Sequence, residues 1–260
     1  MVNRPTSRAL FDLFIGEASQ PFTGWDFSYV SRTGRMQSEP LPWSYASIVI
    51  PYVRRACSLL DMGTGGGEFL SRLKPFPKHS CATEGFEPNY PVAKNRLEPL
   101  GVHVFQFNED TDLPFKENEF ELIINRHESY APGEVRRILE PEGYFITQQV
   151  GEQNDIDINN LLANEPVVEE MEWNATSVAK ELQDAGLKVL QTMEAFPVTR
   201  FYDIGALVFY LKAIPWVVKD FTVDKYANAL LQIHEEILAK GFIDVHEHRF
   251  LLITQNIANQ

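Results

Sequence analysis

Short apolar runs alternate with helical patterns over the middle of the chain. Runs typical of β-strands lie at 57–63, 80–86, 102–107, 120–126 and 143–150. Apolar residues recur at helical spacing at 68–74, 91–101 and 131–143. Strands that alternate with helices in this way predict a mostly parallel sheet with right-handed crossovers and with helices on both faces.

The two ends of the chain follow other patterns. Residues 1–50 mix glycine, proline and serine with aromatic side chains and show no clean period of 2 or 3.6, which predicts an ordered but irregular arm. After an acidic loop, the pattern predicts a helix that ends at Gly186, a further strand, helices at about 203–214 and 225–240, and a last strand at 249–255.

The composition is that of a chain with one large core. It has 260 residues, of which 44% are hydrophobic and 12% aromatic. We expect a domain at 51–260, with the arm, residues 1–50, as a lid and a helical insertion at about 200–241 before the last strand. Cys57 and Cys81 lack metal-ligand spacing, so we expect both to be reduced core residues.

Charge and hydropathy restrict the partners of the chain. The formal net charge of −13 disfavours nucleic acid and an anionic membrane as partners. The apolar stretch 204–218 contains Lys212 and Pro215 and is shorter than the roughly 20 residues that cross a bilayer. The N-terminus does not look like a secretory signal, so we expect a cytoplasmic protein.

The stretch SLLDMGTGGGEFL, residues 58–70, combines an apolar run with an acid and three glycines at every second position. In an open parallel sheet, ligands bind at the carboxyl ends of the strands, and the first strand-to-helix turn is the usual contact. Gly63, Gly65 and Gly67 would let a ligand lie against the backbone at the start of a helix. Asp61 would repel a pyrophosphate there, so it favours a cationic ligand over a dinucleotide.

The pattern DxGxGxG of these residues resembles motif I of the class I S-adenosylmethionine-dependent methyltransferases, whose ligand carries an ammonium, a sulfonium and a carboxylate. By the same resemblance, Glu84 at the end of the second strand, about 20 residues past the glycines, binds the ribose hydroxyls. The stretch FNEDTDLPFKENEF is similar to the acidic turn that lies next to the adenine in this family. Glu109 or Asp110 is then the neighbour of the adenine amino group.

The resemblance covers residues 58–149, with its three motifs in order, and points to the type 11 branch of the family. It implies an α/β fold with a Rossmann-like, doubly wound sheet of seven strands, mostly parallel, whose last strand is antiparallel. Thr64 and Arg126 are further cofactor contacts that it implies. One departure is Glu84 itself, because this branch commonly has an aspartate there and the longer side chain would shift the ribose geometry.

The residues after the fourth strand are candidates for the chemistry of methyl transfer. The protein has to align a nucleophile with the electrophilic methyl group and to remove the nucleophile's proton where it carries one. His127 is the candidate base, with Glu128 to orient it or Tyr130 to act on the substrate. The alternative is that His127 only packs against the methionine part of the cofactor. Neither the Asp/Asn-Pro-Pro-Tyr/Phe motif of base-amine methylation nor a cysteine nucleophile follows this strand.

Three further features allow alternative interpretations. The segment LPWSY either completes the core or covers the cofactor with Trp43. The segment 199–216 either packs in the core or forms a cap over a small, partly apolar substrate, lined by Arg200, Phe201, Tyr202, Tyr210 and Trp216. His246 and His248 share one face of a predicted strand, but without a third ligand we expect a solvated edge and no metal.

The function predicted by these residues is methyl transfer from S-adenosylmethionine to an oxygen or nitrogen nucleophile of a small molecule, with S-adenosylhomocysteine as product. An RNA methyltransferase would keep the fold but would need a basic face near the cleft. A protein that binds the cofactor without transferring methyl is a third hypothesis, which an intact glycine motif does not separate from an enzyme. The sequence indicates neither the acceptor nor the oligomeric state.

Overall fold

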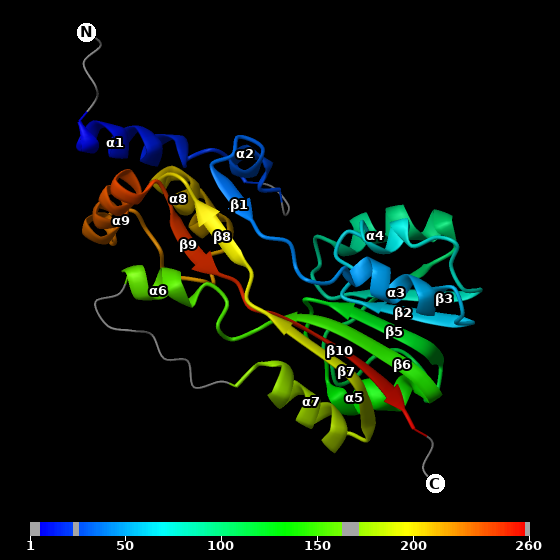
Figure 1. Ribbon diagram of the computed structural model, residues 1–260. Helices are drawn as coiled ribbons and strands as arrows, with labels where there is room; N and C mark the ends of the chain where they lie inside the picture. Colours follow the sequence, from blue (N-terminus) through cyan, green and yellow to red (C-terminus); the bar gives the residue numbers. More distant parts are fainter. Residues whose placement is uncertain (1–5, 23–25, 163–171, 258–260) are drawn as a thin grey trace. The chain divides into compact units, whose positions relative to one another are not determined.

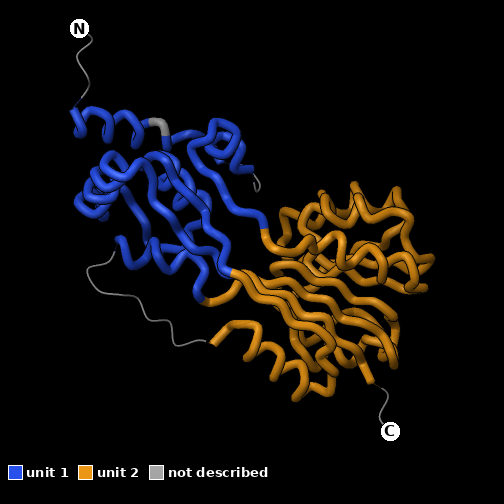
Figure 2. The backbone as a smooth tube through the Cα atoms, viewed as in Figure 1, with its two compact units in different colours: residues 1–40, 153–170, 196–248 blue, residues 41–152, 171–195, 249–260 orange. Residues whose placement is uncertain are grey.

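The structure, a computed structural model, describes residues 6–22, 26–162 and 172–257. The chain divides into two compact units, each made of several segments (Figure 2). Unit 1 comprises residues 1–40, 153–170 and 196–248, and unit 2 comprises residues 41–152, 171–195 and 249–260. Most of the predicted arm and the predicted insertion thus fall in the same unit, and the role of the arm as a lid stays a prediction.

Unit 2 is built on a seven-stranded sheet (Figure 1). Its strands are β2 (Ser58–Met62), β3 (His79–Glu84), β4 (His103–Gln106), β5 (Phe120–Arg126), β6 (Leu139–Val150), β7 (Leu187–Ala195) and β10 (Arg249–Asn256). Their order is β4-β3-β2-β5-β6-β10-β7, parallel from β4 to β6 and antiparallel where β10 pairs with β6 and β7. The predicted Rossmann-like sheet of seven strands with an antiparallel last strand is confirmed.

Helices cover both faces of this sheet, because successive apolar residues of each central strand point to opposite faces. On one face, α3 (Tyr45–Val53), the 3₁₀ helix η1 (Leu70–Arg72) and α4 (Tyr90–Leu97) share a core with Leu59 and Ile124, and η2 (Glu98–Leu100) follows α4. On the other face, α5 (Pro132–Ile138) and α7 (Ala175–Asp184) share a core with Leu60 and Ile123.

One predicted helix of unit 2 is wrong. The pattern predicted a helix at 68–74, whereas the structure has only the three-residue η1 there. Pro75 and Pro77 follow directly, and a residue before proline is disfavoured in the helical conformation. The glycine turn therefore does not lead into the amino end of an α-helix. The predicted helix at 131–143 also ends early, because Leu139 already pairs with Phe120 of β5.

Unit 1 contains a second sheet, of three strands, which the pattern did not predict (Figure 1). Its antiparallel strands, in the order β1-β8-β9, are β1 (Met36–Ser38), β8 (Val198–Phe201) and β9 (Ile243–His246). Its helices are α1 (Ser7–Glu17), α2 (Ser28–Ser31), α6 (Ile156–Leu162), α8 (Ile204–Ala213) and α9 (Ala227–Lys240). The helices predicted at about 203–214 and 225–240 are confirmed as α8 and α9, but the arm is not irregular, because α1 and α3 lie in it.

Two smaller predictions are partly wrong. Cys81 is buried as expected, but Cys57 is exposed. His246 is exposed and pairs with Asp157, whereas His248 is fully buried and its ring stacks on Phe196 with centroids 4.5 Å apart. No cluster of three His, Cys, Asp or Glu side chains that could hold a metal ion occurs among the described residues. In the same part of the chain, no helix is long and apolar enough to cross a membrane.

Candidate functional site

Asp61 lies at the carboxyl end of β2, just before the glycine turn. The residue is 5% exposed, and its Oδ2 accepts a 2.7 Å hydrogen bond from the hydroxyl of Thr64. Burial raises the pKa of Asp61 to about 7, although the Thr64 hydrogen bond and the positive charge of Arg126 act in the opposite direction. The Thr64 hydrogen bond and the charge of Arg126 therefore do not fully offset the cost of burying the ionised carboxylate of Asp61.

The glycine turn has backbone conformations that favour glycine. Gly63, Gly65 and Gly67 all have positive φ, of 66°, 62° and 77°. A Cβ on Gly63 would lie 2.2 Å from Cγ of Glu128, so this side chain packs directly on the turn. A Cβ on Gly65 would meet nothing within 4 Å. The backbone at Gly65 is thus open to close approach by a ligand.

Glu84 ends β3, next to β2, and is 3% exposed. One of its carboxylate oxygens, Oε1, accepts a 2.8 Å hydrogen bond from the N–H of Phe86. Burial raises the pKa of Glu84, while the N–H groups of Phe86, Gly65 and Gly85 lower it. The carboxylate is thereby held beside the glycine turn.

A cavity of about 320 Å³ opens next to Glu84. It is lined by Glu84, Gly85, Phe86, Phe107, Asn108, Asp110, Glu128 and Ser129. Asp110 therefore shares a cavity with Glu84, whereas Glu109 lines a neighbouring one. Phe86 and Phe107 were not among the residues predicted from the sequence, although their places just after the ends of β3 and β4 could have indicated them.

Glu128 links this cavity to the glycine turn. It is half-buried, lines the cavity and packs on Gly63. Burial raises the pKa of Glu128 to about 7, and the negative charges of Glu84 and Asp110 raise it further. Glu128 is therefore close to half-protonated near neutral pH, which suits a group that exchanges protons.

His127 lies between Arg126 and Glu128 in a left-handed conformation, with φ of 61°. Its N–H donates to the carbonyl oxygen of Gln148 at 2.8 Å, and its Nε2 lies 3.0 Å from Nε2 of Gln148. The residue as a whole is exposed to solvent. Partial desolvation and the charges of Arg249 and Arg126 lower the pKa of His127 below its ordinary value. These features do not favour His127 as a base, and its catalytic role stays a prediction.

The remaining predicted residues occupy different environments. The guanidinium of Arg126 is exposed and lies 4.6 Å from the ring centroid of Phe69. Tyr130 is 9% exposed and packs in the core, 5.0 Å from the ring of Phe145. Burial holds the pKa of Tyr130 well above its usual range, so its hydroxyl is poorly suited to give up a proton. Trp43 Nε1 donates a 2.9 Å hydrogen bond to Oε1 of Gln148.

The aromatic side chains of the predicted cap do not share one pocket. Phe201 is fully buried in the core of unit 1, whereas Trp216 is 68% exposed. Arg200 forms an ion pair with Asp244. The structure thus favours core packing for most of this segment.

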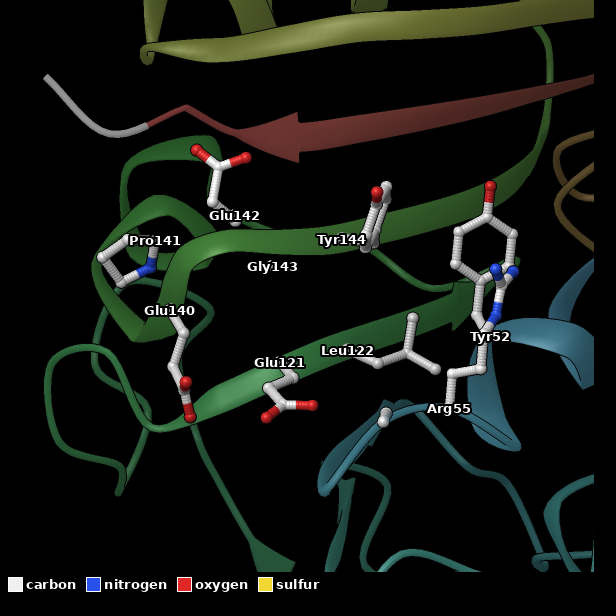
Figure 3. Close-up of a pocket in the computed structure, with 10 residues that line it drawn as sticks. Tyr52, Arg55, Glu121, Leu122, Glu140, Pro141, Glu142, Gly143 and Tyr144 are labelled. Atoms are coloured by element: carbon white, nitrogen blue, oxygen red, sulfur yellow. The ribbon is translucent and has the colours of Figure 1, made fainter. Parts of the chain in front are cut away.

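A second cavity in unit 2, of about 450 Å³, lies at the amino ends of β5 and β6 (Figure 3). Tyr52, Arg55, Glu121, Glu140, Glu142 and Tyr144 contribute side chains to its lining. Two of the acids here have partners: Glu121 accepts a hydrogen bond from the N–H of Cys57, and Glu142 accepts one from Gln255. This cavity is at the other end of the sheet from the glycine turn.

Comparisons with known proteins agree with this fold. Residues 60–147 match the model of a family described as a methyltransferase domain, and no curated protein matches the chain. A candidate methyltransferase from Bacillus halodurans is 16% identical, with a TM-score of 0.59 over 83% of this chain and 100% of that one. A geranyl diphosphate methyltransferase solved with GPP and sinefungin is 15% identical, with a TM-score of 0.50 over 82% and 77%.

The same fold also occurs in a protein that is named as a cyclase. The 4+2 cyclase SpnF is 14% identical, with a TM-score of 0.52 over 98% of both chains. Likeness at these identities shows the fold alone, whereas the family match spans the glycine turn, Glu84 and the acidic turn. Residues 60–147 are thus similar to a methyltransferase domain, and the strand order agrees with a Rossmann-like fold of this kind.

Proposed function

We propose that unit 2 binds S-adenosylmethionine at the carboxyl ends of β2, β3 and β5 and transfers its methyl group to an oxygen or nitrogen nucleophile of a small molecule. The observation that carries this proposal is a group of three carboxyls, Asp61, Glu84 and Glu128, whose pKa values are all raised. Carboxyls that are buried together favour a neutral form, and a bound cation relieves this cost. The sulfonium and ammonium of the cofactor supply such a charge.

The residues of the site fit the parts of this cofactor. Glu84, buried beside the glycine turn, would accept hydrogen bonds from the ribose hydroxyls, and the backbone at Gly65 is open to a ligand. The cavity beyond Glu84, with the rings of Phe86 and Phe107, suits the adenine, with Asp110 near its amino group. Arg126, at the end of β5, offers a guanidinium to the carboxylate of the methionine part.

In methyl transfer, the role of the chain itself is to take up the proton of the acceptor. When bound, the cofactor supplies an electrophilic methyl group. Glu128 is the better proton acceptor, because its pKa of about 7 matches neutral pH, whereas the pKa of His127 is lowered. A small-molecule acceptor is favoured over RNA, because the chain has a net charge of −13.

Calorimetric titration with S-adenosylmethionine and S-adenosylhomocysteine tests the cofactor. We expect dissociation constants of roughly micromolar order for the unmodified chain and a loss of about 100-fold or more in Glu84→Ala. Glu140→Ala, at the other end of the sheet, is the matched control and should bind normally. An unmodified chain that binds neither ligand, or a Glu84→Ala variant that binds as well as the control, would contradict the proposal. Methyl transfer to a panel of hydroxyl and amine compounds then tests the acceptor.

A further inference from the structure

Gln148, near the carboxyl end of β6, lies between Trp43 and His127 and is 4% exposed. Its Oε1 accepts the hydrogen bond from Nε1 of Trp43, at 2.9 Å, while its Nε2 lies 3.0 Å from Nε2 of His127. The indole N–H is only a donor, so an acceptor must face it. The contact with Trp43 therefore fixes which end of the Gln148 amide is oxygen, an assignment that is otherwise ambiguous.

The orientation of this amide fixes the tautomer of His127. An amide nitrogen only donates, so Nε2 of His127 must be the accepting, unprotonated ring nitrogen. The proton of the neutral imidazole is then on Nδ1. If Nε2 were protonated, its N–H would point at the N–H of the Gln148 amide and the hydrogen bond would be lost. The contact with Gln148 therefore opposes a positively charged His127.

The main chain of His127 is held by the same partner. A left-handed conformation costs a residue with a Cβ roughly 1–2 kcal/mol, and such strain persists where the surroundings fix it. The 2.8 Å hydrogen bond from the N–H of His127 to the carbonyl of Gln148 supplies that constraint. Gln148 thus positions both the backbone and the ring of His127.

The other ring nitrogen is available to a ligand. Within the described part of the chain, Nδ1 of His127 has no hydrogen-bond partner, and the residue is exposed to solvent. His127 is next to Glu128, which lines the cavity and covers Gly63. The positive charges of Arg126 and Arg249 act on His127, which favours an oxygen that carries negative charge as the partner of the Nδ1–H.

We propose that Trp43 and Gln148 hold His127 as the Nδ1–H tautomer, so that the imidazole donates a hydrogen bond to an oxygen of the methyl acceptor and does not act as a base. The donor role rests on the proposed methyl transfer at this site, whereas the tautomer does not. His127 is then a residue that touches the substrate, and Gln148 and Trp43 are positioning residues. The acceptor belongs to the class of compounds with a carboxylate or another negatively charged oxygen near the methylated atom.

Nitrogen-15 NMR of histidine-labelled protein without any ligand tests the tautomer. The His127 signal, one of six, is assigned from its loss in His127→Gln. We expect Nδ1 to be the protonated nitrogen and the ring to stay neutral between about pH 5 and pH 8, where an ordinary histidine titrates. A proton on Nε2, or rapid exchange between the two tautomers, would overturn the proposal, and once the signal is assigned this result is read from the unmodified chain.

Two variants test the positioning residues. In Gln148→Glu the new carboxylate accepts from Nε2, so we expect the proton to move to Nε2 and the pKa of His127 to rise. In Trp43→Phe the amide loses the donor that orients it, and we expect a mixture of tautomers. Gln191→Glu, on the exposed part of β7, is the control and should leave the His127 signal unchanged. A folded Gln148→Glu protein with an unchanged signal would show that Gln148 does not set the tautomer.

A pair of isosteric variants tests the donor role during methyl transfer. Asparagine and aspartate both tolerate a left-handed backbone, but only asparagine can donate in place of Nδ1–H. We expect His127→Asn to retain kcat/KM within about tenfold and His127→Asp to lose about 100-fold or more. If His127→Asp retained more of the kcat/KM than His127→Asn, the result would mean that His127 accepts a proton. Failure of cofactor binding would refute the proposed function and leave the NMR result intact, so the two failures are distinguishable.

Discussion

The two ends of the seven-stranded sheet both carry acidic side chains, but they hold them differently. At the carboxyl ends, Asp61 and Glu84 are 5% and 3% exposed, and their pKa values are raised. Figure 3 shows Glu121 and Glu142 at the amino ends. Glu121 is half-buried and accepts a hydrogen bond from a backbone N–H at 2.7 Å, and Glu142 is exposed and accepts one from Gln255. The cavity at the amino ends is the larger of the two, at about 450 Å³ against about 320 Å³.

The two ends differ in the electrostatic cost of their acids, and under the proposed function it is this cost, not the volume of the cavity, that indicates the ligand site. Burial of acids is costly, and a fold retains such acids where something outside the protein compensates them. Glu121 and Glu142 are solvated or hydrogen-bonded within the fold. Asp61, Glu84 and Glu128 are the group that a cation would stabilise.

The largest expected effect is on methyl transfer in Glu128→Gln. The variant keeps the shape of the side chain but cannot accept a proton, so we expect kcat to fall by about 100-fold or more for an acceptor that must lose a proton. Glu140→Gln, its counterpart at the amino ends, should keep full activity. Equal kcat values for Glu128→Gln and the unmodified chain would assign the proton to another group or to solvent.

The second effect is the pH dependence of cofactor affinity. Asp61 and Glu128 have pKa values of about 7, so both are largely protonated at about pH 6 and largely ionised at about pH 8. A cation binds the ionised form better, so we expect S-adenosylmethionine to bind several-fold, up to about tenfold, more tightly at pH 7.5 than at pH 6. S-adenosylhomocysteine, which lacks the sulfonium charge, is the control and should show a smaller change. A stronger pH dependence for the homocysteine compound would be inconsistent with this account.

The smallest effect is on the stability of the free protein. Glu128 has a higher pKa in the folded than in the unfolded chain, so its contribution to stability is lost as pH rises from about 4.5 to about 7. Glu128→Gln removes that cost, and we expect it to stabilise the fold by about 1–2 kcal/mol at pH 8 and by less at pH 5, after allowance for solvent exposure. Urea titrations at the two pH values measure this. A gain that is larger at pH 5 would contradict the raised pKa.

The sequence predicted the glycine turn and its acids because their signals are local. Asp61 and the glycines lie within seven positions of one another, and Glu84 follows at the end of the next strand. The parallel order of the sheet then brings these residues together, because neighbouring strands end at the same edge. Strand alternation was equally clear in the sequence, and it predicted the sheet correctly.

The features that the sequence did not predict depend on contacts between distant residues. Trp43 and Gln148 are 105 positions apart, and nothing in either segment indicates their hydrogen bond. The three-stranded sheet pairs Gln37 with Arg200, in strands of three and four residues that are too short to show a period. The helix predicted after the glycines is absent for a local reason, because Pro75 disfavours the helical conformation of the residue before it despite the apolar spacing.

The central claim is that the carboxyls at the glycine turn accept a cationic cofactor. Calorimetric titration of S-adenosylmethionine at about pH 7, in buffers of different ionisation enthalpy, counts the protons that binding releases. The account predicts binding with net proton release, reduced in Glu128→Gln and unchanged in Glu140→Gln. Binding without proton release, or no binding at all, would contradict it.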